Sequence, residues 1–255
     1  LSIISIENST IGAAIQDVGM KLSDNIEDIQ NLSEYQIILM WPVADGLRNQ
    51  RVMQFSKPRE GYKFNWDAWY SQLNDDDKQQ LPLKELNRTR LYFDLRVIPI
   101  RVADLHPLCR NLDQEEFSFG STYIDRFKNT HLYHVLSGRW DEYDYTPFKE
   151  RESRRSKDAS EWYETVTDKP TLLGKRISNI INACGFISQH EYKINSAYGK
   201  VRADIYVKRP GLNKSNLIIE LKAYSSENTM PSSIKDAIKV TLRRHAQFAG
   251  FLQRQ

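Results

Sequence analysis

The chain has 255 residues, 40% of them hydrophobic and 27% charged, a composition typical of a globular protein with a substantial core. Its longest apolar runs, such as IILMW, are far too short to span a membrane, so we expect no membrane partner and a cytoplasmic location. Only two cysteines are present, without metal-ligand spacing, and of the five histidines only His131 and His134 lie close together, where core or surface histidines are the more common explanation. This argues against a disulfide scaffold and against a Cys/His zinc site.

The net charge of +3 conceals an asymmetry between the two halves of the chain. Residues 1–147 carry 16 Lys and Arg against 22 Asp and Glu, whereas residues 148–255 carry 20 against 11. A basic half is typical of a protein that binds a polyanion, although an ordinary solvated surface has the same composition. From this asymmetry and the charged, tyrosine-rich stretch at Asp141–Lys157, we predict two domains, 1–147 and 148–255.

The N-terminal half is predicted to be mixed α and β, because stretches of helical apolar spacing alternate with short apolar runs. We find no internal repeat in it. Its expected elements, in chain order, are a helix at 10–32, a buried strand at 35–41 that stops at Pro42, a helix at 64–82, one or two strands at 89–105 broken at Pro99, and a helix at 122–140 that ends near Gly138.

The C-terminal half has a simpler pattern. A helix is expected up to Gly185, with Pro170 in its first turn, where a proline is well tolerated. Three strands and a long amphipathic helix should follow. The strands are expected at 187–194, 200–207 and 216–224, and the helix at 232–255.

Asp204, Glu220 and Lys222 stand out because they lie in or next to the second and third of these apolar strands. Charged groups are costly there unless they are paired or bind a cation. Glu220 and Lys222 are two residues apart and therefore point to the same face. Two carboxylates on adjacent strands can converge on one divalent metal and leave room for water and phosphate, with the lysine beside them. A surface ion pair is the alternative.

An Asp on one strand, a turn, and Glu-x-Lys closing the next apolar strand resemble the PD-(D/E)XK nuclease superfamily, which includes restriction endonucleases, Holliday junction resolvases and RecB-type nucleases. The resemblance covers residues 171–253. It implies an α/β fold with a restriction-endonuclease-like core (helix, mixed sheet with a three-strand meander, helix), to which a mixed α+β N-terminal domain is added. It also implies that Asp204 and Glu220 bind Mg²⁺, for which Mn²⁺ can substitute, and that Lys222 is the catalytic lysine.

Relatives in this superfamily often carry a basic or glutamine side chain near the scissile phosphate on the closing helix. The candidates for such nucleic-acid contacts here are Arg243, Arg244, His245 and Gln247. Arg154 and Arg155 in the stretch KERESRRSK could also bind phosphates, although a solvated linker is the more common explanation for such a stretch.

The sequence departs from the superfamily pattern in two places. Ala203 stands where a proline often precedes the aspartate, and Ser178 stands where several branches carry a glutamate on the first helix. A third acidic ligand would then come from elsewhere, with Glu191 the nearest candidate and Glu164 and Asp168 more remote. Glu191 itself opens a second Glu-x-Lys, but the apolar run before it is poorer.

The resemblance implies a magnesium-dependent endonuclease that hydrolyses DNA, with a bacterial restriction or antiviral defence role. If both strands of a duplex are cut, a homodimer is favoured, because two symmetric sites then face the two strands. Two alternatives stay open. One is a catalytically inactive binding module on the same fold, and the other is a ribonuclease that uses the same metal site.

Overall fold

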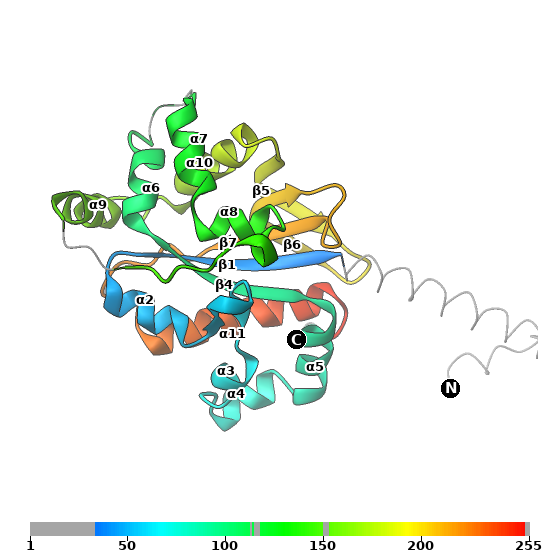
Figure 1. Cartoon of the computed structure of the whole chain (residues 1–255). Helices are drawn as coiled ribbons and strands as arrows, with labels where there is room; N and C mark the ends of the chain where they lie inside the picture. The colour runs from blue at the N-terminus through cyan, green and yellow to red at the C-terminus, as the bar shows by residue number, and fades with distance from the viewer. Residues whose placement is uncertain (1–33, 113, 115–117, 150–152, 253–255) are drawn as a thin grey trace, which may run out of the picture.

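The structure, a computed structural model, describes residues 34–112, 114, 118–149 and 153–252, so the helix predicted at 10–32 lies outside the described residues. Seven strands of the described chain form one mixed sheet in the order β2-β3-β4-β1-β7-β6-β5 (Figure 1). The predicted α/β class is confirmed. The strands are β1 (Tyr35–Val43), β2 (Ser56–Lys57), β3 (Lys63–Phe64), β4 (Asp94–Arg101), β5 (Ile187–Asn195), β6 (Lys200–Lys208) and β7 (Asn216–Leu221).

The centre of the sheet is parallel and its two ends are antiparallel. Strand β1 pairs in parallel with β4 on one side and with β7 on the other, so the carboxyl ends of these three strands share one edge of the sheet. Strands β5, β6 and β7 form an antiparallel meander, and β3 runs antiparallel to both β2 and β4. This shared carboxyl edge contains most of the features described below.

Helices cover both faces of the sheet (Figure 1). One face carries α6 (Val102–Cys109), α7 (Ser121–Lys128), α8 (His131–Leu136), α9 (Arg154–Glu164) and α10 (Pro170–Ala183). The other face carries α2 (Gly46–Met53), α3 (Trp66–Tyr70), α4 (Asp75–Gln80), α5 (Leu83–Tyr92) and α11 (Pro231–Phe248). Two single turns of 3₁₀-helix lie at Pro58–Glu60 and Trp140–Glu142.

The double covering explains the sequence of β1. Every residue of this strand after Tyr35 is buried, as expected for a central strand with helices on both faces. The strand does not stop at Pro42, as the sequence predicted, but continues to Val43. Its ladder with β7 ends at Met40, so Pro42 has a strand neighbour only on the β4 side, where a missing N–H is easier to accommodate.

Two helices that were predicted to be continuous are each divided by a residue that caps a new helix. The Asn74 side chain accepts the Asp77 N–H at 2.8 Å, which begins α4 after the short α3. The Thr130 hydroxyl accepts the Tyr133 N–H at 3.2 Å and begins α8 after α7. Such side chains satisfy the free N–H groups of a first turn, so local capping overrides the longer apolar pattern.

The segment predicted as one or two strands at 89–105 contains three elements. Its first residues complete α5, its middle forms β4, and its end begins α6. Strand β4 runs through Pro99 without a break and is buried on both faces at Val97–Ile100.

The predicted division between residues 147 and 148 does not separate two sheets. Strands from both sides of it pair directly, for example at Ile38 and Ile219. Each of the two hydrophobic cores likewise collects side chains from both halves. The physical reason is that β7 is buried on both faces and needs a second strand neighbour, which β1 supplies from the N-terminal half.

The C-terminal elements follow the predicted order, with α10, then β5, β6 and β7, then α11. Helix α10 has Pro170 at its first position, as expected. None of the helices in the described ranges has the length and apolar character needed to cross a membrane.

Candidate metal centre

Strands β6 and β7 bring Asp204 and Glu220 next to each other. The antiparallel ladder between the strands ends at the pair Ile205 and Ile219. Asp204 and Glu220 are the next residues in register, one on each strand. At this point the Asp204 carboxylate replaces a backbone partner, because its Oδ2 accepts the Leu221 N–H at 2.7 Å. The acid is therefore held against the neighbouring strand by a charge-assisted hydrogen bond.

Glu220 lies at the centre of a charged cluster that is almost closed to solvent. Its exposed fraction is 1%. Arg244 from α11 forms an ion pair with Oε2, and the Lys222 Nζ lies 3.6 Å from the same oxygen. The Nε2 atom of His245, also from α11, lies 3.5 Å from Oε1, which is too far for a strong hydrogen bond. Two cations thus compensate one buried carboxylate.

Lys222 continues the line of β7 along the central strand. Its N–H donates to the Met40 carbonyl at 2.9 Å, and its side chain lies on the same face as Glu220 with 14% of its surface exposed. Burial lowers the pKa of Lys222, and the positive charge of Arg244 lowers it further, while Glu220 and Asp204 oppose the change. An ammonium group of lowered pKa gives up a proton more readily than an ordinary lysine.

The two carboxylates respond to the cluster in opposite ways. Burial raises the pKa of Asp204, and the neighbouring charge of Glu220 raises it further, against the smaller effects of the Leu221 N–H and the two cations. Burial also acts to raise the pKa of Glu220, but His245, Lys222 and Arg244 together outweigh it and lower the pKa to about 2. Glu220 is therefore ionised at neutral pH. The repulsion between the two carboxylates is expressed in the raised pKa of Asp204.

The donor atoms fit a hard divalent cation. Glu220 Oε1 is buried and has no hydrogen-bond partner in the described chain, and neither ring nitrogen of His245 has one. Thr241 Oγ1 and Arg244 Nε share this condition, and buried polar atoms without partners are rare in folded proteins. Among the described residues no group of three His, Cys, Asp or Glu side chains could hold a metal. Two carboxylates are enough for Mg²⁺, which usually keeps several waters.

Four residues of α11 were predicted to contact nucleic acid, and the structure places them in different surroundings. Arg244 belongs to the cluster, but Arg243 points toward α4 and donates to Gln80 Oε1 at 3.2 Å. Gln247 is half-buried three residues beyond Arg244. His245 is fully buried, so a contact with nucleic acid, as predicted, is not open to it in this structure.

His245 contacts Glu220 instead, a role that sequence reasoning missed. The signal was present in the spacing of α11. Ile234, Ile238 and Leu242 form the buried stripe of this helix, and His245 continues that stripe at a helical interval. A histidine in this position faces the sheet.

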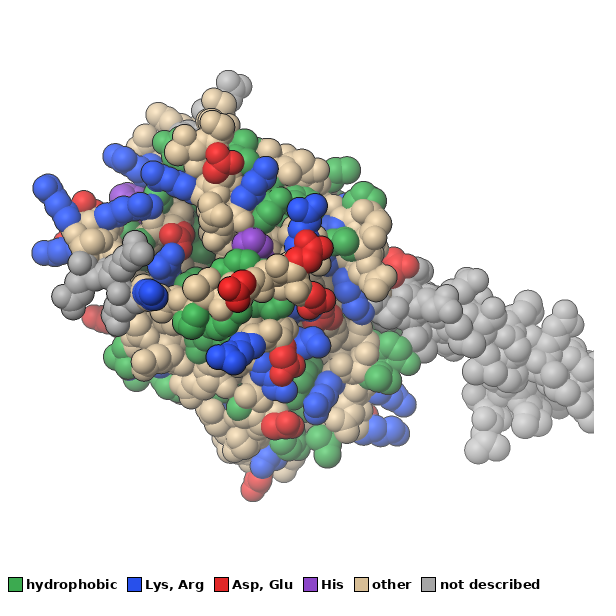
Figure 2. Space-filling model, viewed as in Figure 1, with side chains coloured by type: hydrophobic (Ala, Val, Ile, Leu, Met, Phe, Trp, Pro, Cys, Tyr) green, Lys and Arg blue, Asp and Glu red, His purple; other side chains and the backbone are tan. Residues whose placement is uncertain are grey.

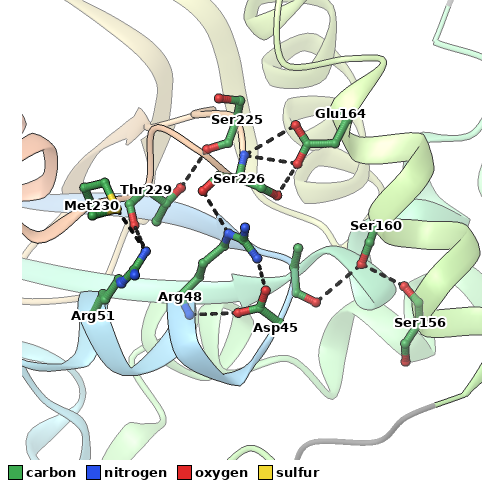
Figure 3. A network of polar contacts seen from close by, with 11 residues as sticks. Asp45, Arg48, Arg51, Ser156, Ser160, Glu164, Ser225, Ser226, Thr229 and Met230 are labelled. Carbon is green, nitrogen blue, oxygen red and sulfur yellow. Dashed lines mark hydrogen bonds and ion pairs between the residues drawn. The ribbon is translucent and has the colours of Figure 1, made fainter.

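The candidate third acids do not join the cluster. Glu191 on β5 forms an ion pair with the exposed Arg202 and accepts the Thr171 hydroxyl at 3.5 Å. Glu164 on α9 accepts the N–H and hydroxyl of Ser226 in the loop after β7 (Figure 3). Asp168 is exposed between α9 and α10. Ser178, where some relatives carry a glutamate, is buried against Ser188 on the opposite face of the sheet.

Arg154 and Arg155 lie in the first turn of α9, at the carboxyl edge of the sheet and apart from the cluster around Glu220. Both are exposed and line a cavity that is described below.

The raised pKa of Asp204 gives a prediction about stability. Below its unfolded-state pKa, the acid is protonated in both states and has no effect. As the pH rises from the ordinary value of 3.8 to the raised value, the unfolded chain ionises first and the folded state loses stability, a loss that persists at neutral pH. In a chelating buffer, Asp204→Asn should therefore have a higher melting temperature than wild type at pH 7, with the difference vanishing below pH 3.8.

Thermal unfolding followed by circular dichroism at a series of pH values would measure this difference. Asparagine keeps an oxygen that can accept the Leu221 N–H, so the hydrogen bond is preserved in the variant. A variant that is less stable than wild type at pH 7 would contradict the raised pKa of Asp204.

No protein-family model, no curated protein and no solved structure matches this chain. Any functional assignment therefore depends on the chemistry of the residues themselves.

Proposed function

We propose that the chain is a magnesium-dependent endonuclease that hydrolyses phosphodiester bonds in DNA. One observation carries this proposal. The Glu220 carboxylate is 1% exposed, has one oxygen without a hydrogen-bond partner among the described residues, and lies next in register to Asp204 and 3.6 Å from the Lys222 ammonium. A buried ion pair is favourable for stability only when its remaining lone pairs are also satisfied, which is not the case for this oxygen.

Each side chain of the cluster has a role in this proposal. Asp204 and Glu220 would hold the metal with their carboxylates, since Glu220 Oε1 has no hydrogen-bond partner in the described chain and Asp204 uses Oδ2 to accept the Leu221 N–H. A bound Mg²⁺ would lower the pKa of a coordinated water and offset the charge of the phosphate. Lys222 orients the attacking water, accepts its proton when deprotonated, and stabilises the negative charge that develops on the phosphate.

Arg244, which pairs with Glu220 in the structure, would also bind the phosphate of the substrate. Its side chain is 39% exposed, so it can leave Glu220 and turn toward solvent. In doing so it would free Glu220 Oε2 and carry a guanidinium group to the phosphate, for which its planar fork is well suited. His245 stays buried behind Glu220, with Nε2 3.5 Å from Oε1.

The choice of DNA, and of a restriction or antiviral defence role, rests on the resemblance to PD-(D/E)XK nucleases. The order α10, β5-β6-β7, α11, with Asp204, Glu220 and Lys222 in their expected places, supports that resemblance. A homodimer would follow if the enzyme cuts both strands of a duplex.

A second function is favoured by the closed state of the cluster. Arg244 and Lys222 already compensate the Glu220 charge, as they would in a nucleic-acid-binding module that has no catalytic activity. Such a module would bind DNA in a salt-dependent manner and would do so equally well with asparagine at position 204.

Incubation with supercoiled plasmid, linear duplex, single-stranded DNA and structured RNA, in Mg²⁺ and in EDTA, distinguishes these functions. The proposal predicts cleavage of at least one DNA form in Mg²⁺ and none in EDTA. Cleavage of RNA alone would establish the ribonuclease. Binding without cleavage of any substrate would support the inactive module.

A further inference from the structure

A second feature of the carboxyl edge lies between β1 and β4. The helices that follow these two neighbouring strands lie on opposite faces of the sheet (Figure 1). Val52 of α2 belongs to the hydrophobic core on one face, and Leu105 of α6 belongs to the core on the other. Such a divergence opens a crevice outside the carboxyl ends of the strands, where open α/β sheets commonly bind ligands.

The crevice is a real cavity of about 800 Å³, large enough for a small ligand. Its floor is formed by the ends of β1 and β4, and its wall by the first turns of α2, α6 and α9. Basic side chains outnumber acidic ones in the lining, and Figure 2 shows Lys and Arg gathered where α9 lies in Figure 1. The basic residues of the lining are Arg101, Lys149, Arg154, Arg155 and Lys157.

The two acidic residues of the lining offset only part of this charge, because Asp45 pairs with Arg48 and Asp104 with Arg101, which leaves the basic residues of 149–157. Asp45 caps α2 by accepting the Arg48 N–H at 2.9 Å and pairs with the Arg48 guanidinium. Asp104 accepts from Arg101 Nε at 2.9 Å. Arg154 and Lys157 are exposed, line the cavity and form no ion pair within the described chain.

Polar groups of the backbone add to the positive character. Three helices begin at the cavity, and α6 begins there without a side-chain cap, which leaves the N–H groups of its first turn available. Asn49 also lines the cavity, and its Oδ1 has no hydrogen-bond donor in the described chain.

The cavity is held in shape by a polar network (Figure 3). Arg48 Nε donates to the Ser226 carbonyl at 2.9 Å, and Glu164 binds the Ser226 N–H at 3.0 Å. The loop that follows Lys222 is thereby tied to both α2 and α9, the helices on either side of the cavity. The Ser160 hydroxyl donates to the Ser156 carbonyl at 2.9 Å and lies 3.4 Å from the Ala44 carbonyl.

From these observations we infer that the crevice between the carboxyl ends of β1 and β4 binds a phosphate group. The phosphate is held by Arg154 and Lys157 together with the first turn of α6. It can belong to a free nucleotide or to the backbone of a nucleic acid, since both offer the same anionic oxygens. This site is separate from the cluster around Glu220 and does not depend on the proposed nuclease activity.

Calorimetric titration of the full chain with inorganic pyrophosphate and with ADP tests the inference. EDTA in the buffer removes any phosphate binding through a metal at Asp204 and Glu220. The double variant Arg154→Glu/Lys157→Glu should weaken binding of both probes by about tenfold or more. Acidic residues are favourable in the first turn of a helix, so this variant should fold normally.

The matched control is Lys84→Glu/Arg88→Glu, which makes the same charge change on two exposed positions of α5, away from the cavity. It should bind both probes as wild type does. The inference is overturned if neither probe binds wild type, or if the cavity variant binds as tightly as the control.

A fluorescent single-stranded oligonucleotide identifies the source of the phosphate. If ADP displaces it and the cavity variant binds it more weakly than the control does, the site holds a nucleic-acid backbone. If ADP binds at the cavity while oligonucleotide binding is the same in both variants, the ligand is a free nucleotide. Either result supports phosphate binding at the crevice.

Discussion

The Lys222→Ala protein should still bind DNA and Mg²⁺, but it should cleave DNA about a thousandfold more slowly than wild type. Removing a positioned acid–base group or a donor to the developing charge commonly lowers the rate by 10²–10⁴-fold, and Lys222 serves in both capacities here. Its ammonium lies 3.6 Å from Glu220 Oε2, within reach of any water held by the two carboxylates. Initial rates of plasmid nicking under single-turnover conditions would measure the change.

Lys193→Ala provides a matched control. Lys193 closes the other Glu-x-Lys of this region, on β5, and its side chain is exposed. The two variants therefore remove the same residue type from the same local pattern. Equal rates in the Lys193 and Lys222 variants would show that the cluster is not the catalytic centre.

The Glu220→Gln variant should lose both cleavage and stability. Glutamine keeps the shape of the side chain but leaves Arg244 and Lys222 without a buried anion. Breaking a fully buried pair costs about 3–5 kcal/mol, and we expect about 2 kcal/mol here, since Arg244 is 39% exposed and can turn to water. Urea unfolding at neutral pH would measure the change in the free energy of unfolding.

The pH dependence of this loss is fixed by the low pKa of Glu220. A carboxylate with a folded-state pKa of about 2 stabilises the folded protein above its ordinary value of 4.5, and that contribution is lost as the pH falls toward 2. The difference in stability between wild type and Glu220→Gln should therefore be largest above pH 4.5 and shrink toward pH 2. A difference that stays constant over this range would contradict the ionised state of Glu220.

Glu191→Gln is the control for stability. Glu191 pairs with Arg202, whose side chain is 62% exposed, and exposed ion pairs contribute little. Its free energy of unfolding should stay within about 0.5 kcal/mol of wild type. The same variant shows by its cleavage rate whether Glu191 takes any part in metal binding.

The part of the fold nearest the cluster could be predicted from the sequence because it depends on local signals. Pro170 and Gly185 bound the helix, and the turn around Gly211 separates two apolar strands whose register follows from their length. The spacing of Asp204, Glu220 and Lys222 then follows from the alternation of side chains along a strand.

The partner of β7 could not be predicted in the same way. Strand β1 lies about 180 residues earlier in the chain, and no local pattern indicates which buried strand pairs with which. The charge asymmetry led to a prediction of two domains. Charge reports on surfaces and carries no information about strand pairing, so it could not indicate that strands of both halves share one sheet. The cavity between β1 and β4 was missed for the same reason, although Arg154 and Arg155 were expected to meet phosphate.

The most direct measurement is a titration of wild type and Asp204→Asn with Mn²⁺, followed by the loss of the free-ion signal in electron paramagnetic resonance. If Asp204 and Glu220 form a metal centre, wild type should bind Mn²⁺ saturably and Mg²⁺ should displace it. The variant should show no binding over the same range. Mn²⁺ binding of equal strength in both proteins, or none in wild type, would contradict the metal centre and with it the proposed nuclease.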